Sequence, residues 1–297
     1  MADARILVTG GAAPRQRGTT AYGCPRDFLD NRQIYVVISP RARGLSVGVN
    51  LNPDRQCNFD CAYCEVNHSR PAPAPAKIDL RAMADELRDT IAFVRSGAIG
   101  TRSPFNLLPP DLLELRHVAI SGDGEPTLCL QFAEAIESVV HVRATIDGGF
   151  FKIVVISNGT GFEQPSVQKG IALLTSRDEI WAKLEAGTQS YMDNINRAGM
   201  PLEKVIENIR LMARQRPVMI QSLFPAISGR GPSEAEILAY AERLKDLKDS
   251  GAQIPLVQIY SATRPTMNPA CGHLPLQALS AIARTVRRVS GLRAEVF

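Results

Sequence analysis

"LRHVAISGDGEPTLCLQFAEAIESVVHVRAT", residues 115–145, contains a strand, a turn and a helix in succession. Residues 115–122 form a short β-rich run that ends in glycine. Residues 130–145 place apolar side chains at helical spacing. Two glycines and two acidic residues lie in the turn between them. The stretch therefore predicts one βα unit with a polar loop at the carboxyl end of its strand.

The same alternation continues on both sides of this stretch. Strands that alternate with helices predict a parallel sheet, and strands that are apolar throughout predict burial on both faces. Six such units are fewer than the eight of a closed barrel, so we predict an α/β fold with a partial (β/α)6 TIM-like barrel. Strands are predicted at residues 45–53, 115–122, 151–159, 179–187, 217–224 and 254–262, and helices at 77–97, 130–145, 165–176, 201–215, 232–251 and 274–291.

Two parts are expected along the chain. Residues 1–44 are predicted to form a loop-rich N-terminal extension and hairpin, the hairpin centred on "IYVVISPRARGLSVGV" (34–49). Residues 45–297 are predicted to form the barrel and a C-terminal helix. "PAPAPA" (71–76) can be neither helix nor inner strand, so we expect an extended connector there.

Composition restricts the class of protein. The 297 residues are 45% hydrophobic, and 34 Lys+Arg against 30 Asp+Glu give a net charge of +4 without a block of one sign. This balance neither requires nor excludes nucleic acid. No run approaches the roughly 18 to 20 apolar residues of a membrane span, and the first residues lack a signal-peptide pattern, so we expect a cytoplasmic protein. In that compartment a disulfide framework is not expected, and the scattered Cys24, Cys129 and Cys271 are interpreted as small buried side chains.

Three other cysteines are clustered in "QCNFDCAYCEVNHSR" (56–70), directly after the first predicted strand. Cys57, Cys61 and Cys64 with His68 could close a tetrahedral Cys3His zinc site. The three cysteines alone could instead hold an iron-sulfur cluster with one iron left open for another ligand. The spacing by itself leaves both sites possible.

Polar residues follow several later strands, where functional groups of parallel barrels gather. Glycines at 122 and 124 would let backbone approach a ligand closely, and the acidic Asp123 and Glu125 lie beside them. An ordinary turn is the alternative interpretation. Further residues at or near strand ends are Ser157, Asn158, Lys183, Glu185, Gln221, Gln258, Tyr260 and Arg264.

Taken together, these segments resemble the radical S-adenosylmethionine (SAM) superfamily. The Cys57-x3-Cys61-x2-Cys64 spacing with the aromatic Tyr63 is similar to the motif that holds a 4Fe-4S cluster there, and "ISGDGEPTL" (120–128) resembles the segment beside the methionyl amino group of SAM. Many members have Gly-Gly-Glu where this chain has Asp123 between two glycines. "ISNGT" (156–160) resembles the segment that contacts the SAM ribose. "SPRARGLSVGVNLNP", "WAKLEAGTQSYMDNINRA" and "LVQIYSATRPT" resemble the branch with the wyosine-type enzymes and uncharacterised Fe-S oxidoreductases, so the resemblance covers roughly residues 38–265.

The resemblance implies a single 4Fe-4S cluster on Cys57, Cys61 and Cys64, with SAM on the open iron and an external one-electron donor such as a flavodoxin or ferredoxin. It implies that SAM lies near Tyr63, the segment from Gly122 through Asp123 and Gly124 to Glu125, and the pair Ser157 and Asn158. Lys183 and Glu185 are either a buried pair or contacts to SAM or substrate, and Arg264 is a candidate partner for a carboxylate. The implied activity is reductive cleavage of SAM and hydrogen abstraction from a small-molecule or unassigned substrate.

Two alternatives remain open. The first is a radical SAM enzyme that modifies tRNA, although only Cys24 precedes the motif where the wyosine enzymes hold a second cluster. The second is a zinc-stabilised binding module without catalytic activity.

Overall fold

The computed structural model describes residues 21–23, 28–68 and 77–297. The predicted loop-rich segment 1–20, the Pro-Ala connector and Cys24 lie outside these residues. Among the helices that are described, none is both long and apolar enough to cross a membrane.

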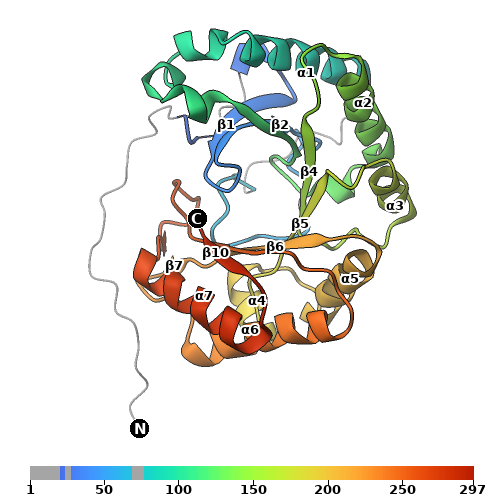
Figure 1. The fold of residues 1–297 in the computed structure, drawn as a ribbon. Helices are drawn as coiled ribbons and strands as arrows, with labels where there is room; N and C mark the ends of the chain where they lie inside the picture. Colours follow the sequence, from blue (N-terminus) through green and yellow to red (C-terminus); the bar gives the residue numbers. More distant parts are fainter. Residues whose placement is uncertain (1–20, 24–27, 69–76) are drawn as a thin grey trace.

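One curved, eight-stranded sheet forms the frame of the fold, in the order β1-β2-β3-β4-β5-β6-β8-β10 (Figure 1). β1 and β2 are antiparallel, and every later pair of neighbours is parallel. The predicted α/β partial barrel is therefore confirmed. The strands are β1 (Ile34–Ser39), β2 (Gly44–Val49), β3 (Leu115–Ile120), β4 (Lys152–Ser157), β5 (Glu179–Lys183), β6 (Val218–Leu223), β8 (Val257–Tyr260) and β10 (Ala294–Val296), and a separate pair is β7 (Ala226–Ile227) with β9 (Cys271–Gly272).

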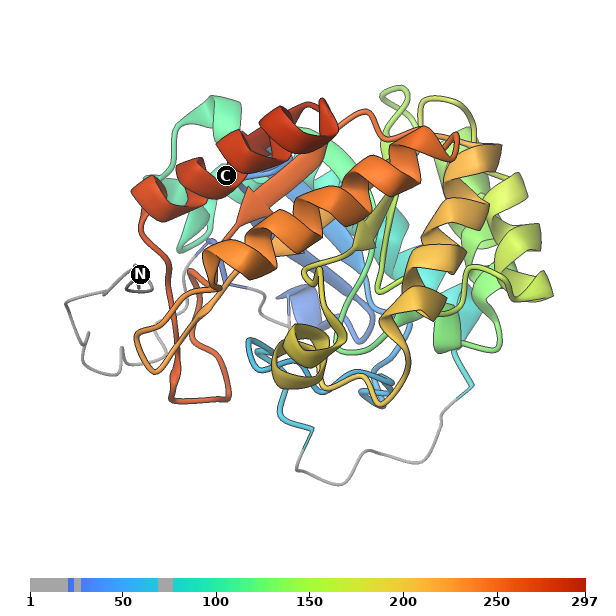
Figure 2. The same cartoon turned by 90° about the horizontal axis from the view of Figure 1, so that it is seen from below.

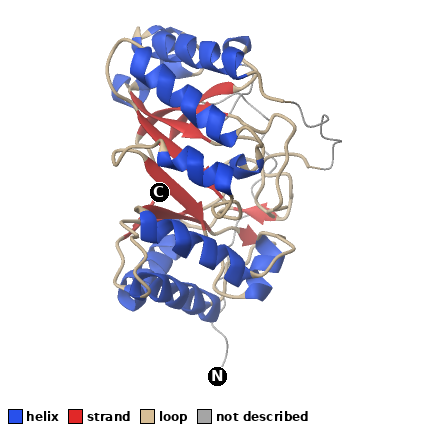
Figure 3. Cartoon of the chain, turned by 90° about the vertical axis from the view of Figure 1, so that its right-hand side faces the viewer, coloured by secondary structure: helices blue, strands red, loops and turns tan. Residues whose placement is uncertain are grey.

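The helices cover the outer face of this sheet (Figure 3). α1 begins where the sequence indicates, because the Asp79 carboxylate accepts hydrogen bonds from the backbone N–H groups of Arg81 and Ala82. The α-helices are α1 (Leu80–Arg95), α2 (Phe132–Thr145), α3 (Pro165–Ala172), α4 (Gln189–Ile195), α5 (Leu202–Gln215), α6 (Glu234–Asp249) and α7 (Leu276–Ser290). Short 3₁₀ helices lie at Phe28–Asp30, Ala98–Thr101, Phe105–Leu107, Pro110–Leu113 and Pro126–Leu128.

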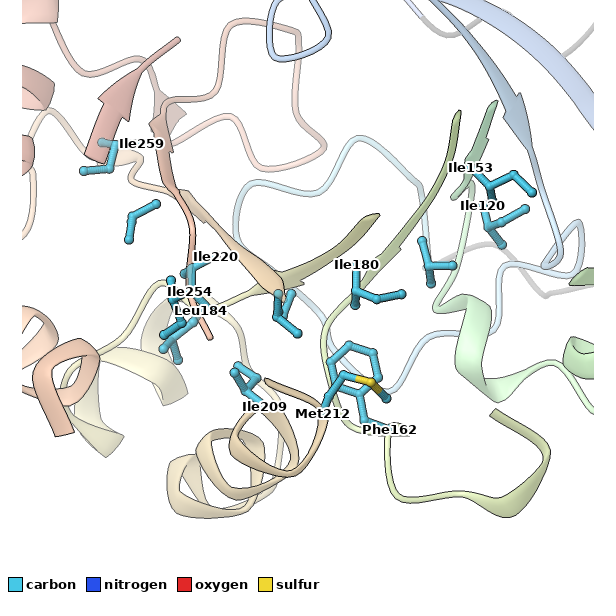
Figure 4. Packing of buried hydrophobic residues seen from close by; sticks show 14 of the residues in the cluster. Ile120, Ile153, Phe162, Ile180, Leu184, Ile209, Met212, Ile220, Ile254 and Ile259 are labelled. Carbon is cyan, nitrogen blue, oxygen red and sulfur yellow. The ribbon is translucent and has the colours of Figure 1, made fainter. Parts of the chain in front are cut away.

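The core lies between the strands and these helices (Figure 4). Alternate strand residues point outward from the barrel, and isoleucines of neighbouring strands form a continuous apolar surface. Met212 of α5 and Phe162 pack against Ile180 of β5, and all three are fully buried. The other alternate residues point into the barrel, which makes them available to form a site.

The turn between β1 and β2 contacts the opposite end of the sheet. The Arg41 guanidinium lies 4.2 Å from the centre of the Tyr260 ring, and Arg43 forms an ion pair with Glu295 at 3.4 Å. On the outer side of β1, the backbone N–H of Ile38 donates to the carbonyl of Ala21 at 2.8 Å. These contacts join the first strand to the last ones across the open side of the barrel.

A buried ion pair ties α2 to the sheet below it. The Asp178 carboxylate accepts hydrogen bonds from Arg143 at 2.6 Å, from the backbone of Ile153 at 2.8 Å and from Thr175. Burial alone would raise the pKa of the Asp178 carboxyl, but the hydrogen bonds from Arg143, Ile153 and Thr175 outweigh it and lower that pKa. The side chain of Asp178 is fully buried and that of Arg143 nearly so.

We predict that Asp178→Ala lowers the free energy of unfolding by about 3 to 5 kcal/mol, because it leaves the Arg143 charge buried without its partner. Since the pKa of Asp178 is lowered in the folded state, its stabilising effect is present above the unfolded pKa and is lost as the pH falls below about 4. Urea unfolding at pH 7 and pH 3 measures both effects. Asp85→Ala, which removes the exposed ion pair with Arg88, is the control and should cost less than about 1 kcal/mol. Equal losses in the two variants would contradict the prediction.

Candidate functional site

A cavity of about 330 Å³ opens inside the barrel, at the carboxyl ends of its strands. The wall beyond the carboxyl ends of the strands contains Cys57, Cys61 and Cys64, together with the turn from Gly122 to Gly124. Its inner wall consists of side chains that point inward from the strands. These include Ser46, Ala119, His117, Trp181, Lys183, Gln221 and Tyr260.

The cysteine loop is fixed on two sides by backbone hydrogen bonds. The backbone N–H of Glu125 donates to the carbonyl of Gln56 at 2.9 Å, which joins the loop to the end of β3. On the other side, Ala62 and Asp60 donate to the carbonyls of Ile195 and Asn196 at the end of α4. Figure 2 shows the loop beside this short helix. The loop is therefore anchored to two elements that are far apart in sequence.

The three thiols are free and half-buried. Burial raises the pKa of Cys57 to about 11 and that of Cys61 to about 12, and it also raises the pKa of Cys64. A buried thiolate is stabilised by a cation, so binding of a metal here would be coupled to proton release. Thiolate sulfur is the ligand that iron-sulfur clusters and zinc prefer.

Each sulfur also has a nitrogen neighbour. The backbone N–H groups of Phe59 and Val66 donate to Cys57 at 3.5 Å and Cys64 at 3.4 Å. Cys61 receives the side-chain amide of Asn196 at 3.8 Å. Hydrogen bonds of this kind are typical of sulfurs that ligate metals.

His68, the candidate fourth zinc ligand, lies with its Nε2 3.4 Å from the Cys64 sulfur. Within residues 21–23, 28–68 and 77–297, no group of three or more His, Cys, Asp or Glu side chains is arranged to hold one metal ion. In a cubane, by contrast, each thiolate ligates a different iron, so the cysteine sulfurs need not converge on one point. The donor type, the shared cavity and the sulfur hydrogen bonds fit a cluster with three protein ligands.

Two glycines permit the close approach of the turn after β3. A Cβ atom on Gly124 would lie 2.0 Å from the carbonyl oxygen of Gln56, and one on Gly122 would lie 2.1 Å from the side-chain oxygen of Asn50. Asn50 also donates to the Asp123 carboxylate at 2.8 Å. Asp123 thus lines the cavity in a fixed orientation. Asn50 was not singled out from the sequence, although its place at the end of a predicted strand was a signal.

Hydrogen bonds join Glu125 to Ser157 and Asn158. None of these three residues lines the cavity. The Glu125 carboxylate is buried and accepts hydrogen bonds from Ser157 Oγ at 2.6 Å, from the backbone of Asn158 at 2.8 Å and from Thr127 at 2.7 and 3.1 Å. Asn158 in turn donates to Asn58 of the cysteine loop at 2.8 Å. These residues join the ends of β3 and β4 to the loop.

Lys183 is the last residue of β5 and Glu185 lies two residues beyond it, and the two side chains differ in surroundings. Lys183 lines the cavity, with its ammonium 5.9 Å from the centre of the Tyr63 ring. Burial tends to lower the pKa of Lys183, but Tyr260, Cys61, Glu185 and Cys64 outweigh it and raise the pKa, so the side chain stays charged. Glu185 is buried behind the wall, where it accepts hydrogen bonds from Tyr63 and Asn196.

The later strands contribute part of the wall. Gln221 and Tyr260 line the cavity, and Arg264 lines its mouth while paired with Glu65 at 3.0 Å. Gln258 does not line the cavity; it is buried and accepts a hydrogen bond from the Gln221 amide at 3.4 Å. The structure adds His117 and Trp181, whose rings meet edge to face at 5.5 Å. His117 alternates with the outward-facing residues of β3, and Trp181 does so on β5. This alternation could have indicated from the sequence that both side chains face the interior of the barrel.

No protein-family model matches this sequence. Among curated proteins, a UPF0026 protein of Helicobacter pylori is 26% identical over 139 residues, which cover 46% of this chain and 38% of that protein. A UPF0026 protein of Synechocystis sp. is 23% identical over 185 residues, 61% of this chain and 60% of that protein. The matches thus span less than two thirds of the length of either relative.

Solved structures match over most of the chain. TYW1 with a lysine-pyruvate adduct bound superposes with a TM-score of 0.57 at 15% identity, covering 88% of this chain and 85% of that one. The fold is that of the radical SAM enzymes. Streptococcus suis SuiB bound to S-adenosylmethionine gives 0.55 at 11% identity over 86% of this chain and 52% of SuiB. A spore photoproduct lyase mutant with dinucleoside spore photoproduct gives 0.52 at 8% identity over 82% and 74%. These likenesses show a shared fold, in agreement with the resemblance that the sequence motifs indicated.

We predict that Glu125→Gln lowers the free energy of unfolding by about 3 kcal/mol, since an amide group would face donors where the carboxylate accepts four hydrogen bonds. Chemical denaturation measures the loss. Glu137→Gln on the exposed face of α2 is the matched control and should change stability by less than about 0.5 kcal/mol. A Glu125→Gln protein as stable as the control would contradict the structural role of this carboxylate.

Proposed function

We propose that this protein is a single-cluster radical SAM enzyme, with a 4Fe-4S cluster held by Cys57, Cys61 and Cys64. The observation that carries the proposal is the arrangement of these three free, half-buried thiols on one loop, at the mouth of a barrel cavity that also contains Gly122, Gly124 and Lys183. The radical SAM fold supports it. We assign the activity to the barrel unit, residues 45–297.

The cofactors would supply one-electron cleavage of the SAM sulfonium, followed by hydrogen abstraction from a substrate. The electron would come from an external donor of the flavodoxin or ferredoxin type. The part of this chain is to bind and orient the cofactors and to exclude water from the cavity. The anchored cysteine loop and the closely packed glycine turn support that role.

The methionyl group of SAM would lie beside the turn from Gly122 to Gly124. We assign the acidic group that complements its ammonium to Asp123, because Asp123 lines the cavity whereas the Glu125 carboxylate is occupied by four hydrogen bonds within the protein. Glu125, Ser157 and Asn158 would then support SAM indirectly, by holding the ends of β3 and β4 in place. Tyr63, which lines the cavity, is the proposed neighbour of the adenine.

Lys183 is the proposed partner of the SAM carboxylate. Its ammonium faces the cavity close to the cysteines, and the raised pKa keeps it charged. Glu185, two residues beyond the end of β5, accepts a hydrogen bond from the Tyr63 hydroxyl at 2.9 Å. Lys183 would therefore contact the ligand, whereas Glu185 would hold the cavity wall through Tyr63.

The substrate would occupy the inner part of the cavity, against His117 and Trp181. Burial, with the charges of Lys152 and Arg41, lowers the pKa of His117 to about 3, so its ring is neutral at physiological pH. A neutral imidazole can both donate and accept a hydrogen bond. These groups suit a small polar molecule, which remains unassigned. Binding of tRNA instead would give an affinity that falls steeply with salt.

The central prediction is that the protein, reconstituted anaerobically with iron and sulfide, takes up one cluster and cleaves SAM to 5'-deoxyadenosine when reduced. Visible absorption, iron content and chromatography of the products measure this. Replacement of Cys57, Cys61 or Cys64 by Ala should abolish cluster uptake and cleavage, because each thiolate ligates one iron. Cys129→Ala, a half-buried cysteine outside the cavity, should retain both. Stoichiometric zinc without cluster absorption would refute the proposal in favour of a zinc site.

A second prediction concerns Lys183. Lys183→Met should weaken SAM binding about 10- to 100-fold, because a charge-assisted hydrogen bond contributes about 1.5 to 3 kcal/mol. Equilibrium dialysis of labelled SAM against the reconstituted protein measures the affinity. Lys169→Met, on the exposed surface of α3, should bind SAM like the wild type. Unchanged affinity in Lys183→Met would leave Lys183 without a role in SAM binding.

A further inference from the structure

The end of α4 supports the cysteine loop through both backbone and side chain. The carbonyls of Ile195 and Asn196 accept hydrogen bonds from Ala62 at 2.7 Å and from Asp60 at 3.1 Å. Helix ends leave such carbonyls without partners inside the helix, so the loop satisfies them. Because these contacts are made by main-chain atoms, they do not depend on the identity of the side chain at position 196.

The side chain of Asn196 makes a separate set of contacts. It is only 2% exposed, and its Nδ2 lies 2.9 Å from a Glu185 carboxylate oxygen, 3.3 Å from the Tyr63 hydroxyl and 3.8 Å from the Cys61 sulfur. A carboxylate only accepts hydrogen bonds. Glu185 therefore fixes the orientation of the amide with its NH2 group directed toward the cysteine.

The two N–H groups of Asn196 have different partners. One is directed to Glu185, and the other is shared between the Tyr63 oxygen and the Cys61 sulfur. Tyr63 gives its own hydroxyl proton to Glu185 at 2.9 Å, so its oxygen is left to accept from Asn196. Cys57 and Cys64 receive backbone donors from their own loop, whereas Cys61 receives the Asn196 amide from the end of α4.

We propose that Asn196 is a positioning residue that sets the reduction potential of the cluster, through an N–H to sulfur hydrogen bond to Cys61. The inference rests on the proposed function, because it concerns the reduction potential of the proposed cluster. Reduction adds negative charge to the cluster and its sulfur ligands. A hydrogen-bond donor directed at a sulfur stabilises that added charge and raises the potential. Glu185 keeps the donor in this orientation.

Loss of the Asn196 side chain removes this donor from the Cys61 sulfur, so the reduction potential of the cluster should fall.

The test is a redox titration of the reconstituted protein without SAM, followed by the electron paramagnetic resonance signal of the reduced cluster. Asn196→Ala should move the midpoint potential to more negative values than wild type, with iron content unchanged. Asn208→Ala is the matched control: Asn208 is also 2% exposed, and it donates to the carbonyls of Gly159 at 3.1 Å and Thr160 at 2.9 Å. Its potential should equal that of wild type.

The inference is overturned if Asn196→Ala has the wild-type potential, or if Asn208→Ala shifts it as much. Asn196→Ser, whose side chain is too short to reach Cys61, provides a second variant and should shift the potential in the same direction as alanine. If both Asn196 variants fold normally but hold no cluster, Asn196 is required for cluster binding. The inference that it sets the reduction potential then fails. Failure of the wild type to take up a cluster would instead reject the proposed function, so the two failures are distinct.

Discussion

The hydrogen bonds around Glu125 hold the carboxyl end of the barrel together. Its backbone N–H binds the carbonyl of Gln56, and its carboxylate binds Ser157, Asn158 and Thr127. The cysteine loop, the end of β3 and the end of β4 are therefore joined through one residue. A buried carboxylate is tolerated only when donors surround it. That requirement fixes the position of all three segments, and with it the position of the cysteines.

The main strands of the fold could be predicted from the sequence, because the strands β2 to β6 and β8 are largely apolar and a helix follows each of them along the chain. β10 and α4 were not predicted, since three and seven residues are too short to show a period. Within the site, the spacing of Cys57, Cys61 and Cys64 indicated the loop and its chemistry. The sequence could not show that Glu125 points into the wall and Asp123 into the cavity, because strand alternation ends where the turn begins. Asn196 was missed for a related reason: its contacts join segments more than 130 residues apart.

Proteins at 8 to 15% identity share this fold while their structures contain a lysine-pyruvate adduct, S-adenosylmethionine or a dinucleoside photoproduct. A barrel of parallel strands permits this variety, because outward side chains maintain the core and inward ones are free to change. In this chain the inward set combines a charged lysine with a neutral histidine, a tryptophan and a glutamine. These side chains line the cavity from the inner face of the strands, separately from the loop that carries the cysteines.

The contacts of the β1–β2 turn have a consequence for colloidal behaviour. An open sheet exposes two edges, and an exposed strand edge can pair with another chain. Here Arg41 and Arg43 bring one edge against Tyr260 and Glu295 near the other, and Ala21 takes the N–H of Ile38 on the outer side of β1. These contacts limit the access of other chains to the edge strands. An open barrel thereby gains protection against edge-to-edge aggregation, which a closed barrel obtains by having no edges.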